Sequence, residues 1–160
     1  MPQVVSQILI QGSKQKIYDV IKEMTAYPRF MPSLVSVEII EQGEGTDLTR
    51  WVSDVDGRRI VWTERDNFYP EQFKITYAQT AGDLKKMEGA WILADTEQGV
   101  SVTLTVDFEF GIPMIAGMLN PLLKRKVREN CVNTLQAVQK QIESYDFFWY
   151  NVGKAELPAG

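Results

Sequence analysis

The sequence contains no histidine. This absence excludes Ser-His-Asp and Cys-His nucleophile systems and removes the commonest metal ligand. Any acid–base chemistry must therefore use Asp, Glu, Tyr, Lys or water. There is a single cysteine, Cys131, which cannot form an internal disulfide and so fits a reducing compartment. Because it lies on an apolar helical stripe, we expect Cys131 to be an inert core residue.

Long apolar runs and an excess of positive charge are also absent. No segment approaches the ~20 apolar residues of a membrane span, and the amino terminus lacks the basic region and apolar core of a signal peptide. We therefore expect a cytoplasmic protein without an integral membrane segment. The net charge of −4 argues against a nucleic acid partner. Asp54-Val55-Asp56-Gly57 resembles the start of a calcium loop but lacks the later ligands, so we predict no metal and no cofactor.

The strongest pattern in the chain is a long amphipathic helix, predicted from Pro113 to about Ser144. Its apolar residues recur at spacings of three and four and form one stripe: Ile115, Met118, Leu119, Leu122, Leu123, Val127, Cys131, Leu135, Val138 and Ile142. Thirty helical residues cover roughly 45 Å. A helix of that length with one apolar side requires a broad partner, and a sheet is the natural one.

The upstream chain has the patterns of that sheet. Residues 3–10 are rich in Val and Ile and predict a first strand, buried because its apolar residues are nearly continuous. Ser13 is a plausible N-cap for a helix over 14–25, and residues 27–32, bracketed by prolines, allow only a turn or a short helical piece. From Leu34 to Phe110 the apolar period is two, and turns divide the region into six further strands. The predicted fold class is α+β, with a seven-stranded antiparallel sheet around the terminal helix, as a single domain at 1–145 with an aromatic extension at 146–160.

Two acids, Glu64 and Asp66, are predicted on the inward face of a strand, where burial of a charged side chain is unfavourable. In the strand that follows the Asp56-Gly57 turn, Trp62, Glu64 and Asp66 share one face, because side chains alternate along a strand. Buried acids are unfavourable unless paired or hydrated, so this face indicates a hydrated cavity. The alternative is that both acids reach solvent or bind a neighbouring arginine, namely Arg58, Arg59 or Arg65.

Large amphipathic side chains on the same concave side suggest a pocket lining. Aromatic rings supply apolar contact while an indole N–H or phenol O–H orients a ligand; the alternative is that these side chains simply form the core. Lys124-Arg125-Lys126 with Arg128 is either a solvated helix face or a site for an anionic partner. The aromatics of the tail either pack on the protein or a dimer mate, or contact a ligand or membrane: Tyr145, Phe147, Phe148, Trp149 and Tyr150.

The order of these elements resembles the START-like helix-grip superfamily over residues 3–144. The stretches that carry the resemblance are similar to its polyketide cyclase and coenzyme-Q-binding branch: Tyr18-Asp19-Val20-Ile21, Tyr27-Pro28-Arg29-Phe30-Met31-Pro32, Gly57-Arg58-Arg59 and Met87-Glu88-Gly89-Ala90-Trp91. The resemblance implies a β-α-α-β6-α helix-grip fold with an apolar molecule held in a cavity between sheet and helix.

Within that branch, residues 62–66 and 87–91 are similar to the aromatase/cyclases of aromatic polyketide synthesis. One departure concerns the pocket arginine of the tetracenomycin-type enzymes, because Asp66 stands at that place and Arg65 points to the opposite face. We predict Glu64 and Asp66 as catalytic residues. The predicted ligand-binding residues are Tyr27, Phe30, Trp51, Trp62, Tyr77, Met87, Trp91, Phe108, Met114, Met118 and Leu122.

Three functions remain open at this stage. The first is binding, and cyclisation, of an aromatic or polyketide-like molecule; the second is carriage of a quinone or lipid without chemistry; the third is a protein-interaction role like that of ribosome-associated relatives. The inward acids favour the first, since a carrier for a long isoprenoid needs an almost wholly apolar cleft. The predicted partner is a hydrophobic or aromatic small molecule, with a homodimer and an acyl carrier protein as further candidates.

Overall fold

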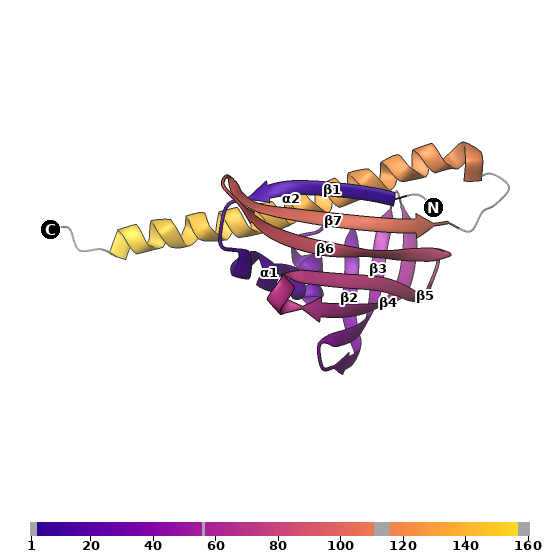
Figure 1. Ribbon diagram of the computed structural model, residues 1–160, viewed down its shortest axis with the longest axis horizontal. Coiled ribbons are helices and arrows are strands. Elements are labelled where there is room, and N and C mark those ends of the chain that lie inside the picture. Colours follow the sequence, from indigo (N-terminus) through magenta and orange to yellow (C-terminus); the bar gives the residue numbers. More distant parts are fainter. Residues whose placement is uncertain (1–2, 56, 111–115, 157–160) are drawn as a thin grey trace.

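The computed structural model describes residues 3–55, 57–110 and 116–156, with side chains except at 116–120 and 145–156. Figure 1 shows a curved sheet with the long helix across its concave side. The sheet has seven antiparallel strands in the order β1-β7-β6-β5-β4-β3-β2, which confirms the predicted fold class. Its strands are β1 (Gln3–Ile10), β2 (Leu34–Gly43), β3 (Thr46–Val55), β4 (Arg58–Tyr69), β5 (Lys74–Gly82), β6 (Lys86–Thr96) and β7 (Gly99–Glu109). The helices are α1 (Lys14–Lys22), η1 (Met24–Arg29), η2 (Pro70–Gln72) and α2 (Ala116–Glu156), η marking 3₁₀ turns.

The helix α2 packs its apolar stripe against β1 and β7. Cys131, Leu135, Val138 and Ile142 are buried there, and Gln139 Nε2 donates to the Leu9 carbonyl at 3.0 Å. The helix continues to Glu156, beyond the predicted end near Ser144, so the predicted boundary at residues 145–146 falls inside it. Its carboxyl-terminal turns extend past the sheet (Figure 1). The predicted start at 113–115 lies outside the described residues, and no described helix is both long and apolar enough to cross a membrane.

The strand β1 is half exposed, which corrects the prediction of a buried strand. Val4 and Ile10 face the helix and are buried, whereas Val5 is 55% exposed. The reason is that β1 is an edge strand of a sheet covered on one face only, so its outward-pointing aliphatic side chains meet solvent. An apolar run alone does not reveal how many faces of its strand are covered.

The first helix begins as predicted and ends earlier. Ser13 caps it, since its side chain accepts a hydrogen bond from Lys16 N at 3.1 Å. The α-helix stops at Lys22 instead of Thr25, and η1 follows and carries Tyr27 into the concave side. Farther along the chain, Phe73 immediately precedes β5 and has a left-handed φ of 50°.

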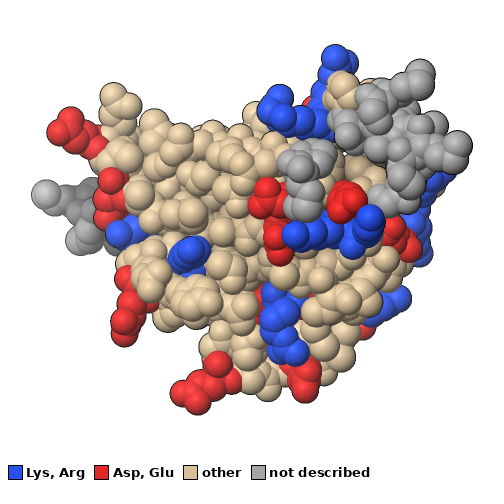
Figure 2. All heavy atoms as spheres, turned by 45° about the vertical axis from the view of Figure 1, so that its right-hand side comes forward, with Lys and Arg blue, Asp and Glu red and all other residues tan. Residues whose placement is uncertain are grey.

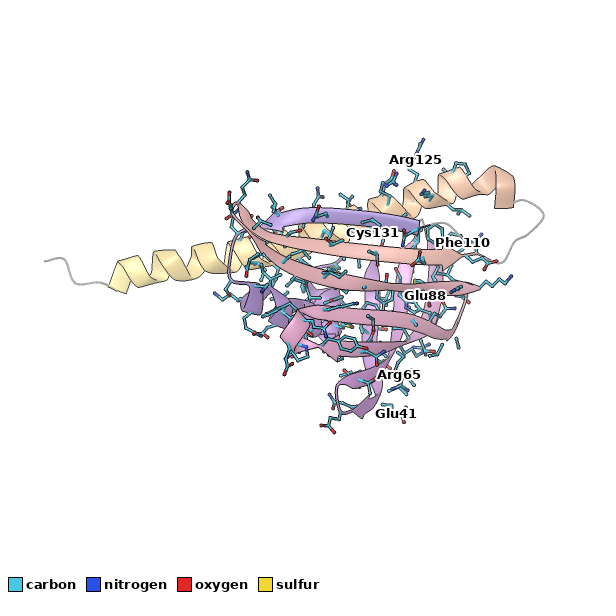
Figure 3. The ribbon with its side chains drawn as sticks, in the orientation of Figure 1. Glu41, Arg65, Glu88, Phe110, Arg125 and Cys131 are labelled. Atoms are coloured by element: carbon cyan, nitrogen blue, oxygen red, sulfur yellow. The ribbon has the colours of Figure 1, made fainter. Side chains whose placement is uncertain are left out.

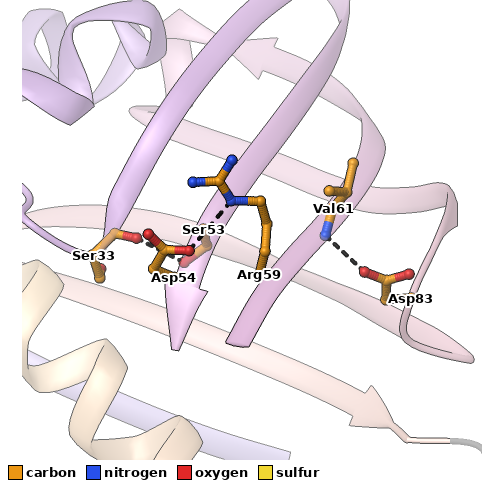
Figure 4. A network of polar contacts seen from close by, with 6 residues as sticks. All are labelled: Ser33, Ser53, Asp54, Arg59, Val61 and Asp83. Carbon is orange, nitrogen blue, oxygen red and sulfur yellow. Dashed lines mark hydrogen bonds and ion pairs between the residues drawn. The ribbon is translucent and has the colours of Figure 1, made fainter. Parts of the chain in front are cut away.

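Polar contacts fix the hairpin of β3 and β4 in position. Val55 pairs with Arg58 around the predicted two-residue turn, and Gly57 has a φ of 79°. Figure 4 shows the supporting network at this end of the hairpin. Asp54 Oδ1 binds Arg59 Nε at 3.4 Å, and the Ser33 carbonyl accepts from both Ser53 Oγ and Asp54 N. These contacts tie β2, β3 and β4 together beneath the tryptophans that the hairpin carries.

Candidate functional site

An aromatic wall, defined here as Tyr27, Phe30, Trp51, Trp62 and Trp91, lines the concave side of the sheet. Trp51 and Trp62 are cross-strand partners, and their rings stack with centroids 5.7 Å apart and planes 10° apart. Tyr27 meets Phe30, Trp51 and Trp91 edge to face, with centroid distances of 5.9, 5.7 and 6.5 Å. Its hydroxyl donates to the Ile21 carbonyl, which holds the ring in place. Five predicted ligand-binding side chains therefore lie together.

The place of Trp62 depends on two residues that the sequence-based prediction missed. At Gly82, with φ of 153°, a Cβ would lie only 2.5 Å from Trp62 Cβ, so a glycine is needed for β5 to end against this tryptophan. Asp83 Oδ2 then accepts from Val61 N at 2.9 Å (Figure 4). Nothing in the sequence of residues 81–83 indicated a contact with Trp62.

The carboxyl pair, Glu64 and Asp66, lies beside this wall and inside the protein. Glu64 is 4% exposed and Asp66 is 0% exposed. This burial excludes the alternative of direct solvent contact. In the part of the chain that the structure describes, neither acid is bound to an arginine. Arg59 binds Asp54, and Arg65 Nη2 lies 3.5 Å from Glu41 Oε2 on the other side of the sheet (Figure 3). The shared face of Trp62, Glu64 and Asp66 is as predicted.

The carboxyl pair is hydrogen bonded to the wall through both stacked tryptophans. Trp62 Nε1 donates to Glu64 Oε1 at 2.8 Å. Trp51 Nε1 donates to Thr49 Oγ1 at 2.7 Å, and Thr49 Oγ1 donates to Asp66 Oδ2 at 2.6 Å. Thr49 was not predicted, although it lies two residues before Trp51 and so shares its face of β3.

Burial governs the proton affinity of the pair. Desolvation raises the pKa of Glu64 well above its usual range, and the adjacent Asp66 raises it further. Desolvation also raises the pKa of Asp66, while hydrogen bonds from Glu64 and Thr49 act in the opposite direction. Two adjacent carboxylates cannot both ionise cheaply in a buried environment. The shifts therefore favour retention of a proton by the pair, more strongly at Glu64 than at Asp66.

The remaining predicted residues differ in their access to the concave side. Tyr77 is buried, and its hydroxyl passes over Gly89 to donate to the Thr105 carbonyl at 2.7 Å. Phe108 is buried, and its ring meets that of Phe110, which the prediction missed, edge to face at 5.2 Å. Met87 is half-buried against the core. These three positions line the part of the concave face nearest β7.

The predicted residues from the terminal helix do not join this group in the described structure. Leu122 is 50% exposed. It stands nine residues before Cys131, which on a helix of 3.6 residues per turn is the opposite side. Met114 lies outside the described residues, and the side chain of Met118 is not among those described.

Three further observations concern the surroundings of the site. A shallow groove of about 370 Å³ lies on the convex face, lined by the outward side chains of Thr76, Ala78, Ala90 and others, so it is separated from the carboxyl pair by the sheet. Among the described residues, no group of three or more acids and cysteines is placed to hold a metal ion. In the view of Figure 2, basic and acidic side chains lie interspersed around a broad uncharged area.

The sheet, its covering helix and the inward aromatic wall define a helix-grip domain. The chain belongs to the polyketide cyclase/dehydrase and lipid transport family, whose sequence model matches residues 10–132. This confirms the resemblance drawn from the sequence.

Relatives in this family have different names. The chain is 29% identical over 107 residues to the actinorhodin polyketide synthase bifunctional cyclase/dehydratase of Streptomyces coelicolor, a match that covers 66% of this chain and 34% of that protein. It therefore spans about a third of that relative's length. It is also 23% identical over 145 residues to the ribosome association toxin RatA of Escherichia coli, and this match covers 90% of each protein.

Solved structures share the fold at low identity. A Thermus thermophilus protein superposes with a TM-score of 0.85 and 22% identity, covering 90% of this chain and 99% of that one. The Zhui aromatase/cyclase from a Streptomyces species superposes with a TM-score of 0.81 and 23% identity, covering 89% and 93%. These similarities establish the fold, and the family binds small hydrophobic molecules.

Proposed function

We propose that the protein binds an uncharged aromatic or polyketide-like molecule against the aromatic wall and acts on it as an aromatase/cyclase. The observation that carries the proposal is the carboxyl pair, which lies among apolar rings without an arginine or lysine bound to either acid in the described structure. A pure carrier gains nothing from two buried acids, whose burial is costly. Acid–base chemistry on a ketone would use them.

The binding half of the proposal rests on the exposed part of the wall. Trp62 and Phe30 are half-buried, while Trp51 behind them is buried and stacked on Trp62. A planar ligand would extend that stack on the face of Trp62 that is turned away from Trp51. Aromatic pairs contribute about 0.5–1.5 kcal/mol beyond the area they bury.

The chemical half assigns different roles to the two acids. Glu64 would donate its proton to a ketone oxygen as an enolic carbon of the same chain attacks that carbonyl. The new C–C bond converts the ketone to a hydroxyl, and the enol O–H, now on a protonated carbonyl, returns its proton to the pair. In dehydration, the carbon next to the one that bears the hydroxyl gives a proton to the pair. The C–O bond then breaks, and the hydroxyl leaves as water with a proton from the pair. Much of the rate gain would come from holding the two carbons in contact.

Asp66 would act through Glu64, because it is completely buried. Its place matches that of the pocket arginine in the tetracenomycin-type resemblance, while Arg65 faces away and binds Glu41. The arginine-dependent mechanism is therefore not the one proposed for this chain.

Two measurements test binding and turnover separately. Binding of 1,8-dihydroxyanthraquinone is followed by quenching of tryptophan fluorescence; Trp62→Ala should weaken it about tenfold, as expected for loss of one ring contact, and Trp62→Phe should weaken it less. Turnover of a supplied linear poly-β-ketone is followed by mass spectrometry of the products. Glu64→Gln should reduce cyclised, dehydrated product about a hundredfold or more with little change in anthraquinone affinity, whereas the exposed-site control Glu97→Gln should change neither.

The opposite results would support the carrier. If Glu64→Gln and Asp66→Asn left affinity and product profile unchanged, the acids would have no part in the site. Native mass spectrometry of protein purified from its own host would then identify the cargo. A quinone or lipid present at near-stoichiometric amount would contradict the cyclase.

A further inference from the structure

Thr49 lies at a junction of two side-chain hydrogen bonds, one to the aromatic wall and one to the carboxyl pair. Its side chain is buried and contacts both Trp51 and Asp66. An indole nitrogen can only donate, so the Thr49 hydroxyl accepts from Trp51. Its own proton is then donated to Asp66 Oδ2, and a hydrogen bond received there favours the ionised form of Asp66 over a proton on Oδ2.

The same reasoning restricts Glu64. Trp62 Nε1 donates to Glu64 Oε1, so a proton on Glu64 must be on the other oxygen, Oε2. Asp66 Oδ1 is buried and receives no hydrogen bond from any N–H or hydroxyl group in the described part of the chain. Glu64 and Asp66 interact through their side chains, and this interaction raises the pKa of Glu64 and lowers that of Asp66. Glu64 Oε2 and Asp66 Oδ1 are the atoms that the contacts above leave available to share a proton.

We infer that Thr49 is a positioning residue that keeps Asp66 ionised and leaves the single proton of the pair on Glu64. The asymmetry arises from the contacts: Asp66 receives a short hydroxyl hydrogen bond in addition to that from Glu64, and hydrogen bonds to a carboxylate favour its charged form. Glu64 receives one indole N–H. The member with slight exposure to the concave side is therefore the one that holds the transferable proton.

Other titratable and charged groups around the pair were considered from each element that packs there. Tyr27 comes from η1, Tyr77 from β5 and Cys131 from α2, and burial raises the pKa of all three, so they are neutral at physiological pH. Asp47 on β3 pairs across from Asp66 and opposes its ionisation, while Arg65 on β4 favours it. Asp47, whose own pKa is raised by burial, is the further acid that acts on the pair.

This inference deepens the proposed function, and its catalytic meaning rests on that proposal, whereas the proton arrangement itself does not need a ligand. Infrared difference spectroscopy of the ligand-free protein detects the carbonyl stretch of a protonated carboxylic acid. At neutral pH the native protein should show this band, and Glu64→Gln should lose it. A band that persists in Glu64→Gln would place the proton on another acid and overturn the inference, whether or not any Thr49 variant folds.

The role of Thr49 is tested by the pH at which the pair takes up its second proton. Thr49→Val should move that midpoint up by about one pH unit, because Asp66 loses a charge-assisted hydrogen bond. Thr49→Ser restores the hydroxyl and should restore the native midpoint. Two control variants, Thr103→Val on β7 and Asp47→Asn, should keep the carbonyl band of the protonated acid. In each of them, Thr49→Val should still raise the midpoint. An unchanged midpoint in folded Thr49→Val would overturn the inference. The proposed function is tested separately, by anthraquinone binding and by turnover of the poly-β-ketone.

Discussion

Replacing Glu64 by glutamine is expected to flatten the pH dependence of stability. Burial raises the pKa of Glu64 in the folded protein, whereas in the unfolded chain it ionises near its ordinary value of 4.5. Between those two values the folded state binds the proton and the unfolded state releases it. A raised acid therefore stabilises the fold fully below its unfolded pKa, and that contribution is lost as pH rises through the folded pKa.

The magnitude follows from the number of protons released on unfolding. One proton corresponds to a decrease in the free energy of unfolding of about 1.4 kcal/mol per pH unit. From pH 6 to pH 8, native protein that keeps the Glu64 proton should lose up to about 2.7 kcal/mol. Glutamine can accept from Trp62 Nε1 and donate to Asp66 through its amide, so the variant keeps both contacts without the proton. Its slope in this range should be close to zero.

Because the sequence has no histidine, no imidazole contributes to the pH dependence of stability in this measurement. No imidazole titrates between pH 5 and 8, provided that the protein carries no histidine tag. Urea unfolding followed by far-ultraviolet circular dichroism at pH 6, 7 and 8, at constant ionic strength, gives the slopes. Glu97→Gln, in the exposed β6–β7 turn, serves as the control and should keep the native slope. Equal slopes for Glu64→Gln and the native protein would refute the argument that Glu64 holds a proton in the folded state.

Three further predictions concern the scaffold. Gly89→Ala would place a Cβ 1.9 Å from the Thr105 carbonyl oxygen, so it should cost more than about 2 kcal/mol; an unchanged thermal unfolding temperature would disprove the close approach. Cys131 is buried, with its pKa raised to about 11, so alkylation by iodoacetamide at pH 8, measured by mass spectrometry, should be on the order of a hundredfold slower than in urea; equal rates would show an accessible thiol. Ser13→Ala removes the cap on Lys16 N and should cost about 1 kcal/mol in urea unfolding, whereas Ser13→Asp should cost much less.

Alternation along the strands predicted the face of each site residue, because the period of two is a property of the backbone. It placed Trp62, Glu64 and Asp66 together before their surroundings were known. The two-residue turn predicted at 56–57 also determines the register of β3 against β4. Pairing Val55 with Arg58 brings Trp51 opposite Trp62 and Thr49 opposite Glu64. Thr49 could therefore have been found from the sequence by counting outward from that turn.

The hydrogen bonds of the site could not be predicted in this way. Whether Thr49 bonds to its cross-strand partner Glu64 or to Asp66 depends on side-chain rotamers and on strand twist. The pairing of β4 with β5 is irregular between Thr63 and Glu64, and no pattern of polarity marks such a shift. Leu122 shows a related limit: adjacent apolar residues in a helix cannot both face the sheet, and the spacing rule did not decide which one does.

The position of β1 has a consequence for how this domain is made. The first strand pairs only with β7, so Gln3 lies beside Asp107, and α2 then packs over the same strand. A chain emerging from the ribosome carries β1 without its neighbour until β7 has been synthesised. Contacts between such distant segments form late, because the loop-closure entropy must be paid first. Closure of this sheet is therefore expected at the end of synthesis, with the exposed edge of β7 open to wrong partners until the amino-terminal strand joins it.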